Sequence, residues 1–140
     1  MKLKIRREFE YEVEDAVFMC RELNAEGAQE LQEDILNMAS SMQRGEAIQG
    51  LSMLSRLSYK AAVNSVYDWQ GIEDDSGKPV KFTPALLPEL EYKTLTAIGK
   101  EALRRSFPEF ESMFTAIDEL ESSDEPEADV DSQKKETADD

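Results

Sequence analysis

The sequence predicts a mainly α-helical fold of the α+β class, with about four amphipathic helices, a short N-terminal β-hairpin and a disordered acidic C-terminal tail. Three observations predict it. Apolar and charged residues alternate over the first 13 positions, which is the period of a half-buried strand. Later stretches repeat apolar residues every three or four positions, as a helix with one buried face does. The last part of the chain is acidic and almost free of large aliphatic residues, as disordered segments are.

We therefore expect one helical domain over residues 1–121 and a disordered tail over residues 122–140. Residues 118–140 carry 11 acidic and 2 basic residues, a net charge of −9, whereas residues 1–117 carry 20 acidic and 14 basic residues, a net charge of −6. Such a tail cannot bury enough apolar surface to offset an ordering entropy of roughly 1–2 kcal/mol per residue. Its charge is expected either to keep a complex dispersed or to attract a basic patch on a partner.

The N-terminal hairpin is predicted from residues 1–20. Glu14-Asp15 forms a two-residue turn into a second apolar run, Ala16–Cys20. The first strand would point these residues inward: Leu3, Ile5, Phe9, Tyr11 and Val13. Its other face divides into a basic half and an acidic half, at Lys2, Lys4 and Arg6 and at Glu8, Glu10, Glu12 and Glu14. That face is expected to be solvated, or else to pair strands between copies. The hairpin must pack on its own helices or pair with another chain, because an isolated hairpin is marginal in water.

The first two helices are expected to form an antiparallel hairpin. Asn24 is a suitable N-cap for the first and Gly45 a suitable C-terminal residue, and the second runs from about Glu46 to Val66. The predicted buried face of the first is Ala28, Leu31, Ile35, Met38 and Met42. That of the second is Ile48, Leu51, Leu54, Leu57 or Ser58, Ala61 and Ser65. Gly50 inside the second helix indicates a close contact there.

A loop is predicted from Asp68 to Thr83, because Gly71, Gly77 and Pro79 punctuate it. A third helix should begin near Pro88 and end before Phe107-Pro108. Its predicted buried stripe is Tyr92, Leu95, Ile98 and Ala102. A final helix would place on one side Phe110, Met113, Phe114, Ile117 and Leu120.

Charge and composition exclude several classes of protein. A net charge of −15 argues against a general nucleic-acid binder and against docking on anionic membranes. The longest runs without a charge, Ile35–Gln43 and Ala47–Ser55, are too short to span a bilayer, and the N-terminus lacks a signal-peptide core. Cys20 is the single cysteine, so the sequence fits a reducing cytosol and predicts a buried structural thiol.

No catalytic residue, metal site or cofactor is predicted. The chain has no histidine, which removes the commonest general base and metal ligand. The acidic loop Glu73–Lys78 lacks the spacing of a calcium loop or of a phosphate-binding loop, so a plain turn is expected.

The apolar residues around the central loop are the candidates for partner binding. Trp69, with its neighbours Tyr67, Ile72 and Phe82, would either clamp the two helical pairs together, which is the favoured interpretation, or form an interaction hot spot. Frequent methionines in the first two helices either fill the core or suit a helical partner. The residues proposed for an interface are Leu51, Leu54, Trp69, Ile72 and Phe82.

The segment Trp69–Ile72, followed by Asp74–Val80 and Phe82–Pro84, resembles the central motif of the tail assembly chaperones of long-tailed bacteriophages. Arg21–Leu23 before a helix that opens Asn-Ala-Glu is also similar. The resemblance implies a protein without enzymatic activity that binds the helical tape measure protein, keeps it soluble and helps recruit tail tube subunits. It implies action in the host cytoplasm and absence from the finished tail. Relatives often have a second, frameshifted product, and the codons of Gln133–Glu136 would permit one here.

Two other classes of function compete with this one. An acidic mimic of nucleic acid that blocks a host factor would need carboxylates spaced like phosphates on rigid elements, whereas much of the charge lies in the tail. An enzyme that uses only carboxylates or tyrosine would need a carboxylate-lined pocket or a bound divalent ion.

Overall fold

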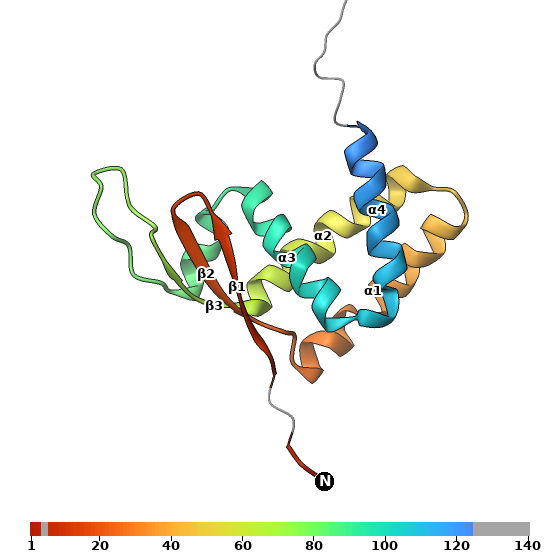
Figure 1. Cartoon of the computed structure of the whole chain (residues 1–140), viewed down its shortest axis with the longest axis horizontal. Coiled ribbons are helices and arrows are strands. Elements are labelled where there is room, and N and C mark those ends of the chain that lie inside the picture. Colours follow the sequence, from red (N-terminus) through yellow and green to blue (C-terminus); the bar gives the residue numbers. More distant parts are fainter. Residues whose placement is uncertain (4–5, 125–140) are drawn as a thin grey trace, which may run out of the picture. The chain divides into compact units, whose positions relative to one another are not determined.

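A computed structural model of the chain describes residues 1–3 and 6–124. The elements follow one another as β1 (Glu8–Val13), β2 (Ala16–Arg21), α1 (Ala25–Gln43), α2 (Ala47–Ser65), β3 (Val66–Gln70), the 3-10 helix η1 (Pro84–Glu89), α3 (Tyr92–Ser106), the 3-10 turn η2 (Pro108–Phe110) and α4 (Glu111–Asp124) (Figure 1). The predicted mainly helical fold with an N-terminal hairpin is confirmed. The chain divides into two units, Met1–Phe107 and Pro108–Asp140, and each is described by itself.

The N-terminal hairpin has the predicted turn. β1 and β2 are antiparallel, and their last pair is Val13 opposite Ala16, so Glu14 and Asp15 form a two-residue connection. Glu14 adopts a φ of 53°, the left-handed conformation that such turns require. β1 begins at Glu8, so the strand expected from the first residue is shorter than the alternation predicts. Two inward-facing residues, Leu3 and Ile5, are expected before Glu8, and Ile5 lies outside the described residues.

The sheet has a third strand that the sequence analysis missed. β3 pairs antiparallel with β2, which gives the order β1-β2-β3, and the loop predicted from Asp68 is therefore wrong for Asp68–Gln70. α2 passes into β3 with no turn residue between them, so no local pattern marks the change. A register shift between Met19 and Cys20 opposite β3 also disturbs the alternation that identifies a strand.

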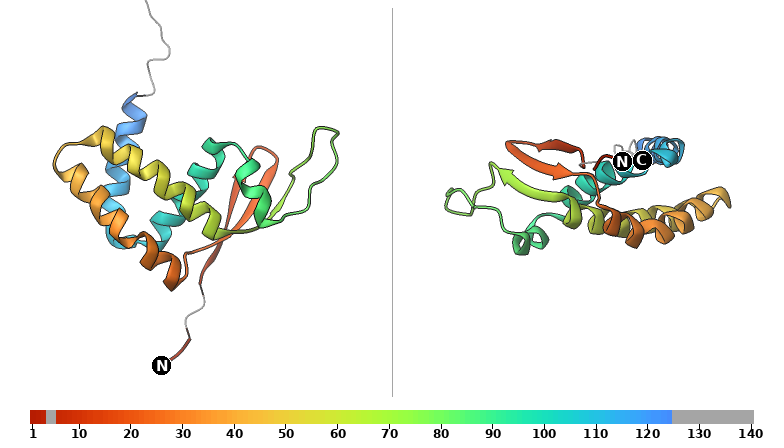
Figure 2. Two further views of the ribbon diagram at one scale, coloured as in Figure 1. Left: turned by 180° about the vertical axis from the view of Figure 1, so that it is seen from behind. Right: turned by 90° about the horizontal axis from the view of Figure 1, so that it is seen from below.

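α1 and α2 form the predicted helical hairpin, which extends away from the sheet within this unit (Figure 2). The Asn24 side chain accepts a hydrogen bond of 2.7 Å from the Gly27 amide, and Gly45 has a φ of 80°, so both predicted ends are confirmed. The buried residues of α1 are Gly27, Leu31, Ile35, Met38 and Ser41. Those of α2 are Gly50, Leu54, Leu57, Ser58, Ala61, Ala62 and Ser65.

One predicted buried position on this hairpin is exposed, and one predicted contact is present. Ile48 is 86% exposed, because it lies two positions before the buried Gly50 and so roughly 200° around the helix from it. Gly50 does make a close contact, since a Cβ there would lie 2.5 Å from the Met42 sulfur.

α3 begins at Tyr92, four residues after Pro88, because Pro84–Glu89 forms η1 instead. Leu95, Ile98 and Ala102 are buried as predicted, but Tyr92 is 55% exposed and the expectation that it lies in the buried stripe is wrong. Its position in the first turn leaves it at the edge of the face that α3 packs against α2. α2 and α3 make the most extensive helix contact of this unit.

The hairpin packs on helices of its own chain. Phe18 and Cys20 of β2 are buried, and the Arg105 guanidinium of α3 lies 4.3 Å from the ring centre of Phe9 on β1. The Leu23 amide donates a hydrogen bond of 3.0 Å to Ser106 at the end of α3. These contacts hold the inner face of the sheet against α3.

In the second unit, η2 leads into α4, which carries Met113, Phe114, Ile117 and Leu120 as predicted. Phe110 ends η2 rather than lying in the helix. α4 continues to Asp124, so Ser122–Asp124 are helical where the sequence predicts the start of the tail. The rest of that tail, residues 125–140, lies outside the described residues.

Candidate protein-interaction surface

The five residues predicted for an interface fall into two groups. Leu51 and Leu54 lie on α2, where Leu51 is half-buried and Leu54 is 3% exposed. Trp69, Ile72 and Phe82 lie in β3 and in the segment that follows it. Leu54 and Trp69 are thus core residues, and Leu51, Ile72 and Phe82 are half-buried.

Trp69 joins the segment after β3 to the sheet. It is 6% exposed, and its ring meets Phe82 edge to face at 5.0 Å and Phe18 edge to face at 6.2 Å between ring centres. Its indole N–H donates a hydrogen bond of 2.8 Å to the Val80 carbonyl. The sequence analysis expected a clamp between helical pairs; the contacts of Trp69 instead bind residues 80–82 to β2.

The acidic loop is a turn closed by its own hydrogen bonds. The Asp74 carboxylate accepts from the amides of Ser76 and Lys78 at 2.8 and 3.1 Å and from the Ser76 hydroxyl at 2.6 Å. These bonds lower the pKa of Asp74, the Ser76 hydroxyl most of all. Gly77 supplies the positive φ of 85° that the turn requires. In the described residues, 1–3 and 6–124, no group of three or more acidic or cysteine side chains is placed to hold a metal ion.

Cys20 is fully buried on the inner face of β2. Burial raises the pKa of its thiol to about 11, while the Ser65 hydroxyl and the Arg105 charge oppose the rise. A thiol with this pKa is protonated at neutral pH and is therefore a poor nucleophile.

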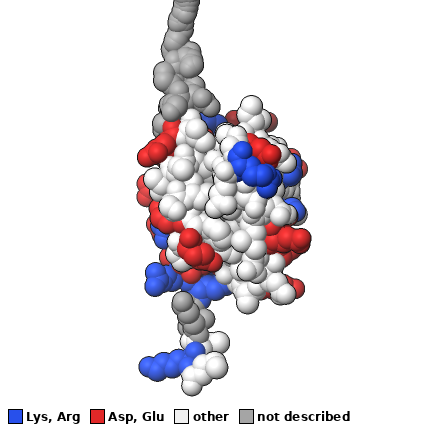
Figure 3. Space-filling view, turned by 90° about the vertical axis from the view of Figure 1, so that its right-hand side faces the viewer, with Lys and Arg blue, Asp and Glu red and all other residues white. Residues whose placement is uncertain are grey.

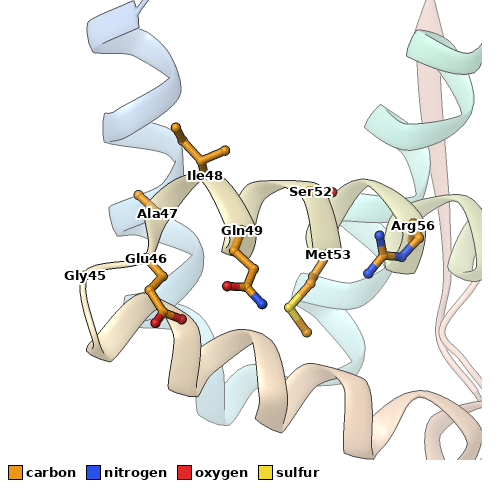
Figure 4. A pocket seen from close by; sticks show the side chains of 8 residues that line it. All are labelled: Gly45, Glu46, Ala47, Ile48, Gln49, Ser52, Met53 and Arg56. Carbon is orange, nitrogen blue, oxygen red and sulfur yellow. The ribbon is translucent and has the colours of Figure 1, made fainter.

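A surface that the sequence analysis did not identify follows α2. Three adjoining hollows, of about 860, 110 and 480 Å³, open along this helix, and Arg56 lines all three. We call their combined lining the α2 groove; beyond Gly45–Ala47 at its start, it consists of Ile48, Gln49, Ser52, Met53, Arg56, Leu57, Tyr59 and Lys60, with Asp34 of α1 and Tyr92 of α3. Figure 4 shows the largest hollow, in which Gln49 and Met53 point toward α1 and Ile48 points the other way.

An aromatic pair forms the end of the α2 groove nearest to α3. Tyr59 and Tyr92 stack with their ring centres 6.1 Å apart and their planes 22° from parallel. The hollow at this end is lined by these rings and by Arg56 and Lys60. Tyr59 and Tyr92 are 33 positions apart in the sequence, and only the packing of α3 on α2 brings them together. This is why the sequence pattern did not reveal the groove.

The α2 groove contains two acidic and two basic residues, Asp34, Glu46, Arg56 and Lys60. Lys60 lies 4.0 Å from Asp34, and Arg44 and Glu46 form a 3.0 Å ion pair at the turn between the helices. Arg56 has no ion pair or hydrogen bond within residues 1–3 and 6–124. Between Ile35 and Ser55 the chain carries only two charged residues, Arg44 and Glu46. On the side of the molecule that carries this turn, residues other than Lys, Arg, Asp and Glu form most of the visible surface (Figure 3).

The α2 groove can therefore offer apolar and aromatic contacts around the Arg56 guanidinium, which is unpaired within the described residues. Such a surface suits a protein segment that presents apolar side chains and an acidic group. Its length along a helix suits an extended or helical partner better than a small molecule.

Comparison with known proteins adds no relative. No family model matches the chain, and neither a curated protein nor a solved structure matches it. Within the described residues, no helix combines the length and the apolar character that crossing a bilayer requires. The motif that resembles the tail assembly chaperones lies in β3, in the Asp74 turn and in the segment that Trp69 holds.

Proposed function

We propose that this protein is a tail assembly chaperone of a long-tailed bacteriophage, and that it acts by protein binding in the host cytoplasm. Its client would be the helical tape measure protein, which it would keep soluble while tail tube subunits are recruited. The observation that carries the proposal is the α2 groove, a surface with apolar and aromatic residues and no net charge on a chain of net charge −15. The motif over residues 69–84 supports it.

The apolar groove and the acidic charge of the chain have separate roles in this proposal. An amphipathic helix of the client would place its apolar stripe along Met53, Tyr59 and Tyr92. An acidic residue of that helix would meet Arg56, which has no other partner in the described part of the chain. The excess of acidic residues elsewhere would keep the coated client dispersed, because like-charged complexes repel one another.

The test is co-expression with the long coiled-coil protein encoded nearby in the genome, followed by pull-down and size measurement. We expect a soluble complex that contains many copies of this chain for each client. Tyr92→Ala and Arg56→Glu should each leave folding intact, since both side chains are exposed, and should reduce client recovery about tenfold or more.

Tyr67→Ala is the matched control. Tyr67 is a half-buried tyrosine on the sheet, away from the residues of the α2 groove, and its loss should leave the complex unchanged. A client that stays insoluble with or without this protein would contradict the proposal. If duplex DNA displaced a captured host protein instead, the chain would be an acidic mimic of nucleic acid.

A further inference from the structure

β1 has an open edge. β2 occupies one side of β1, and no strand in the described residues occupies the other. The Glu22 amide donates a hydrogen bond of 2.9 Å to the Arg7 carbonyl. Because every second residue of an antiparallel strand bonds the same neighbour, the backbone groups of Phe9, Tyr11 and Val13 also point toward β2. The N–H and C=O groups of the residues between them therefore point to the open edge. These residues are Glu8, Glu10 and Glu12.

The segment that precedes β1 has the pattern of a strand. Glu22 holds its end, because the Glu22 amide donates to the Arg7 carbonyl and the Arg6 guanidinium donates a hydrogen bond of 3.2 Å to the Glu22 carbonyl, but Lys2 and Leu3 have no strand partner among the described residues. Leu3 is 91% exposed, and Lys2 and Arg7 are exposed as well. Apolar and basic residues alternate through this arm in phase with β1. Because Arg6 and Arg7 run directly into Glu8 with no turn, the arm cannot fold back on the strand that it enters. A strand partner for Lys2 and Leu3 would therefore come from another chain.

We propose that two copies of this chain form a dimer in which the arm, residues 1–7, of each copy pairs antiparallel with the open edge of the other copy's β1. The two-fold axis would pass at Arg7. Lys2 would then lie opposite Glu12, and Arg6 opposite Glu8. On the other face, Leu3 would lie opposite Tyr11. The two three-stranded sheets would join into one continuous sheet.

Hydrogen-bond direction and charge favour this register over one centred on Glu10, and the apolar face favours it over registers centred on Arg6 or Glu8, which would place Arg7 opposite an apolar residue. Only even-numbered residues of β1 present backbone groups to the open edge, so even-numbered residues must face one another there. Centring the axis on Glu10 would place Glu8 opposite Glu12 twice, and like charges opposite one another destabilise a pair of strands. Centring it on Arg7 gives the arm of each copy two opposite-charge pairs among the described residues, Lys2 with Glu12 and Arg6 with Glu8, and places Arg7 opposite its own counterpart as a like-charge contact.

The acidic side chains of β1 differ in what already holds them. Glu10 and Glu12 are exposed and have no ion pair within residues 1–3 and 6–124. Glu8 lies 3.4 Å from Arg21 and accepts a 3.0 Å hydrogen bond from Tyr67, which holds it on the outer face of the sheet. The same row of carboxylates could instead protect a monomer's edge from pairing, and this alternative is what the test must separate.

The test is a charge exchange, measured by light scattering and sedimentation on the full chain with any affinity tag at the C-terminus. The wild type should dimerise reversibly. Lys2→Glu and Glu12→Lys should each weaken the homodimer about tenfold or more, because each creates two like-charge pairs. Mixed together, the two variants should dimerise again, because every such pair in the mixed dimer is of opposite charge.

Glu33→Lys on the exposed face of α1 is the matched control and should leave the dimer unchanged. Circular dichroism of each variant verifies folding. A wild type that is monomeric at all accessible concentrations overturns the proposal and assigns the carboxylate row to edge protection. A dimer that is insensitive to both variants, or variants that do not restore one another, also overturns it. The proposal does not depend on the client protein proposed above.

Discussion

Gly99 of α3 lies directly against the backbone of Ser58 of α2. A Cβ built on Gly99 would overlap the Ser58 carbonyl group, so the two helices cross with their backbones in contact at this point. Position 99 requires glycine because there is no space for a Cβ. Its backbone conformation does not require glycine, since its φ lies in the ordinary helical range of α3. The crossing brings α3 close enough to α2 for the stacked pair Tyr59–Tyr92 to form.

Replacing Gly99 with alanine should force α2 and α3 apart. We expect a loss of about 1–3 kcal/mol in the free energy of unfolding, or more, because backbone atoms cannot yield as a side chain can. Urea denaturation followed by circular dichroism measures it. Gly50→Ala is the control, since a Cβ there would crowd only the flexible Met42 side chain and would meet the Met38 carbonyl oxygen at an ordinary 3.9 Å. Equal effects of the two substitutions would contradict the backbone contact.

The Ser58 hydroxyl predicts a stabilising substitution. It is buried and has no hydrogen-bond partner within the described residues. Ser58→Ala removes an unsatisfied polar group and should raise the free energy of unfolding by about 1 kcal/mol. Ser65→Ala should lower it by about as much, because the Ser65 hydroxyl donates to the Arg21 carbonyl. The two substitutions should change the free energy of unfolding in opposite directions. A loss of stability in both variants would show that Ser58 has an unseen partner.

Trp69 is the residue that should be most costly to truncate. Trp69→Ala should lower the free energy of unfolding by about 3–5 kcal/mol, because it removes a buried ring that contacts Phe18 and Phe82. Trp69→Phe keeps most of the ring and loses the hydrogen bond to Val80, so about 1–2 kcal/mol is expected. Chemical denaturation of both variants measures the difference. Normal stability with lost client binding would instead identify Trp69 as a hot spot.

Cys20 predicts a loss of stability at alkaline pH. The pKa of its thiol is raised from 9.0 to about 11 in the folded state, so the unfolded chain loses this proton first as pH rises. The contribution of the protonated Cys20 thiol to the free energy of unfolding is complete below pH 9 and declines between pH 9 and 11. Denaturation of the wild type and of Cys20→Ala across this range isolates the effect from other titrating groups. The stability difference should shrink as pH rises; a constant difference would exclude the shift.

The sequence predicted most of the elements because each has a local cause. Asn24 is a cap that bonds its own helix, Gly45 ends α1 with a positive φ, and the Glu14-Asp15 turn follows from the alternation on both sides. β3 was missed because its cause is not local: Val66–Gln70 is a strand because β2 lies beside it. The same reason explains Tyr92, whose exposure depends on where α3 begins to pack on α2.

The candidate surface was harder to predict than the fold. Leu54 and Trp69 have the residue types of an interface, but the same types build a core, and the structure buries both. The α2 groove joins residues of α1, α2 and α3 that no single period places together. Arg56 drew no attention in the sequence because one exposed arginine on a helix is ordinary; its lack of a partner within the described residues is a property of the fold.

The direct passage from α2 into β3 restricts how the length of this protein can change. Val66 follows the last residue of the helix and is the first residue of the strand, so no connecting loop exists there to absorb an added residue. One residue inserted into α2 would rotate everything after it by roughly 100° and turn Trp69 away from Phe18. Insertions and deletions should therefore be tolerated at the exposed tip around Ser76 and Gly77 and rejected throughout α2.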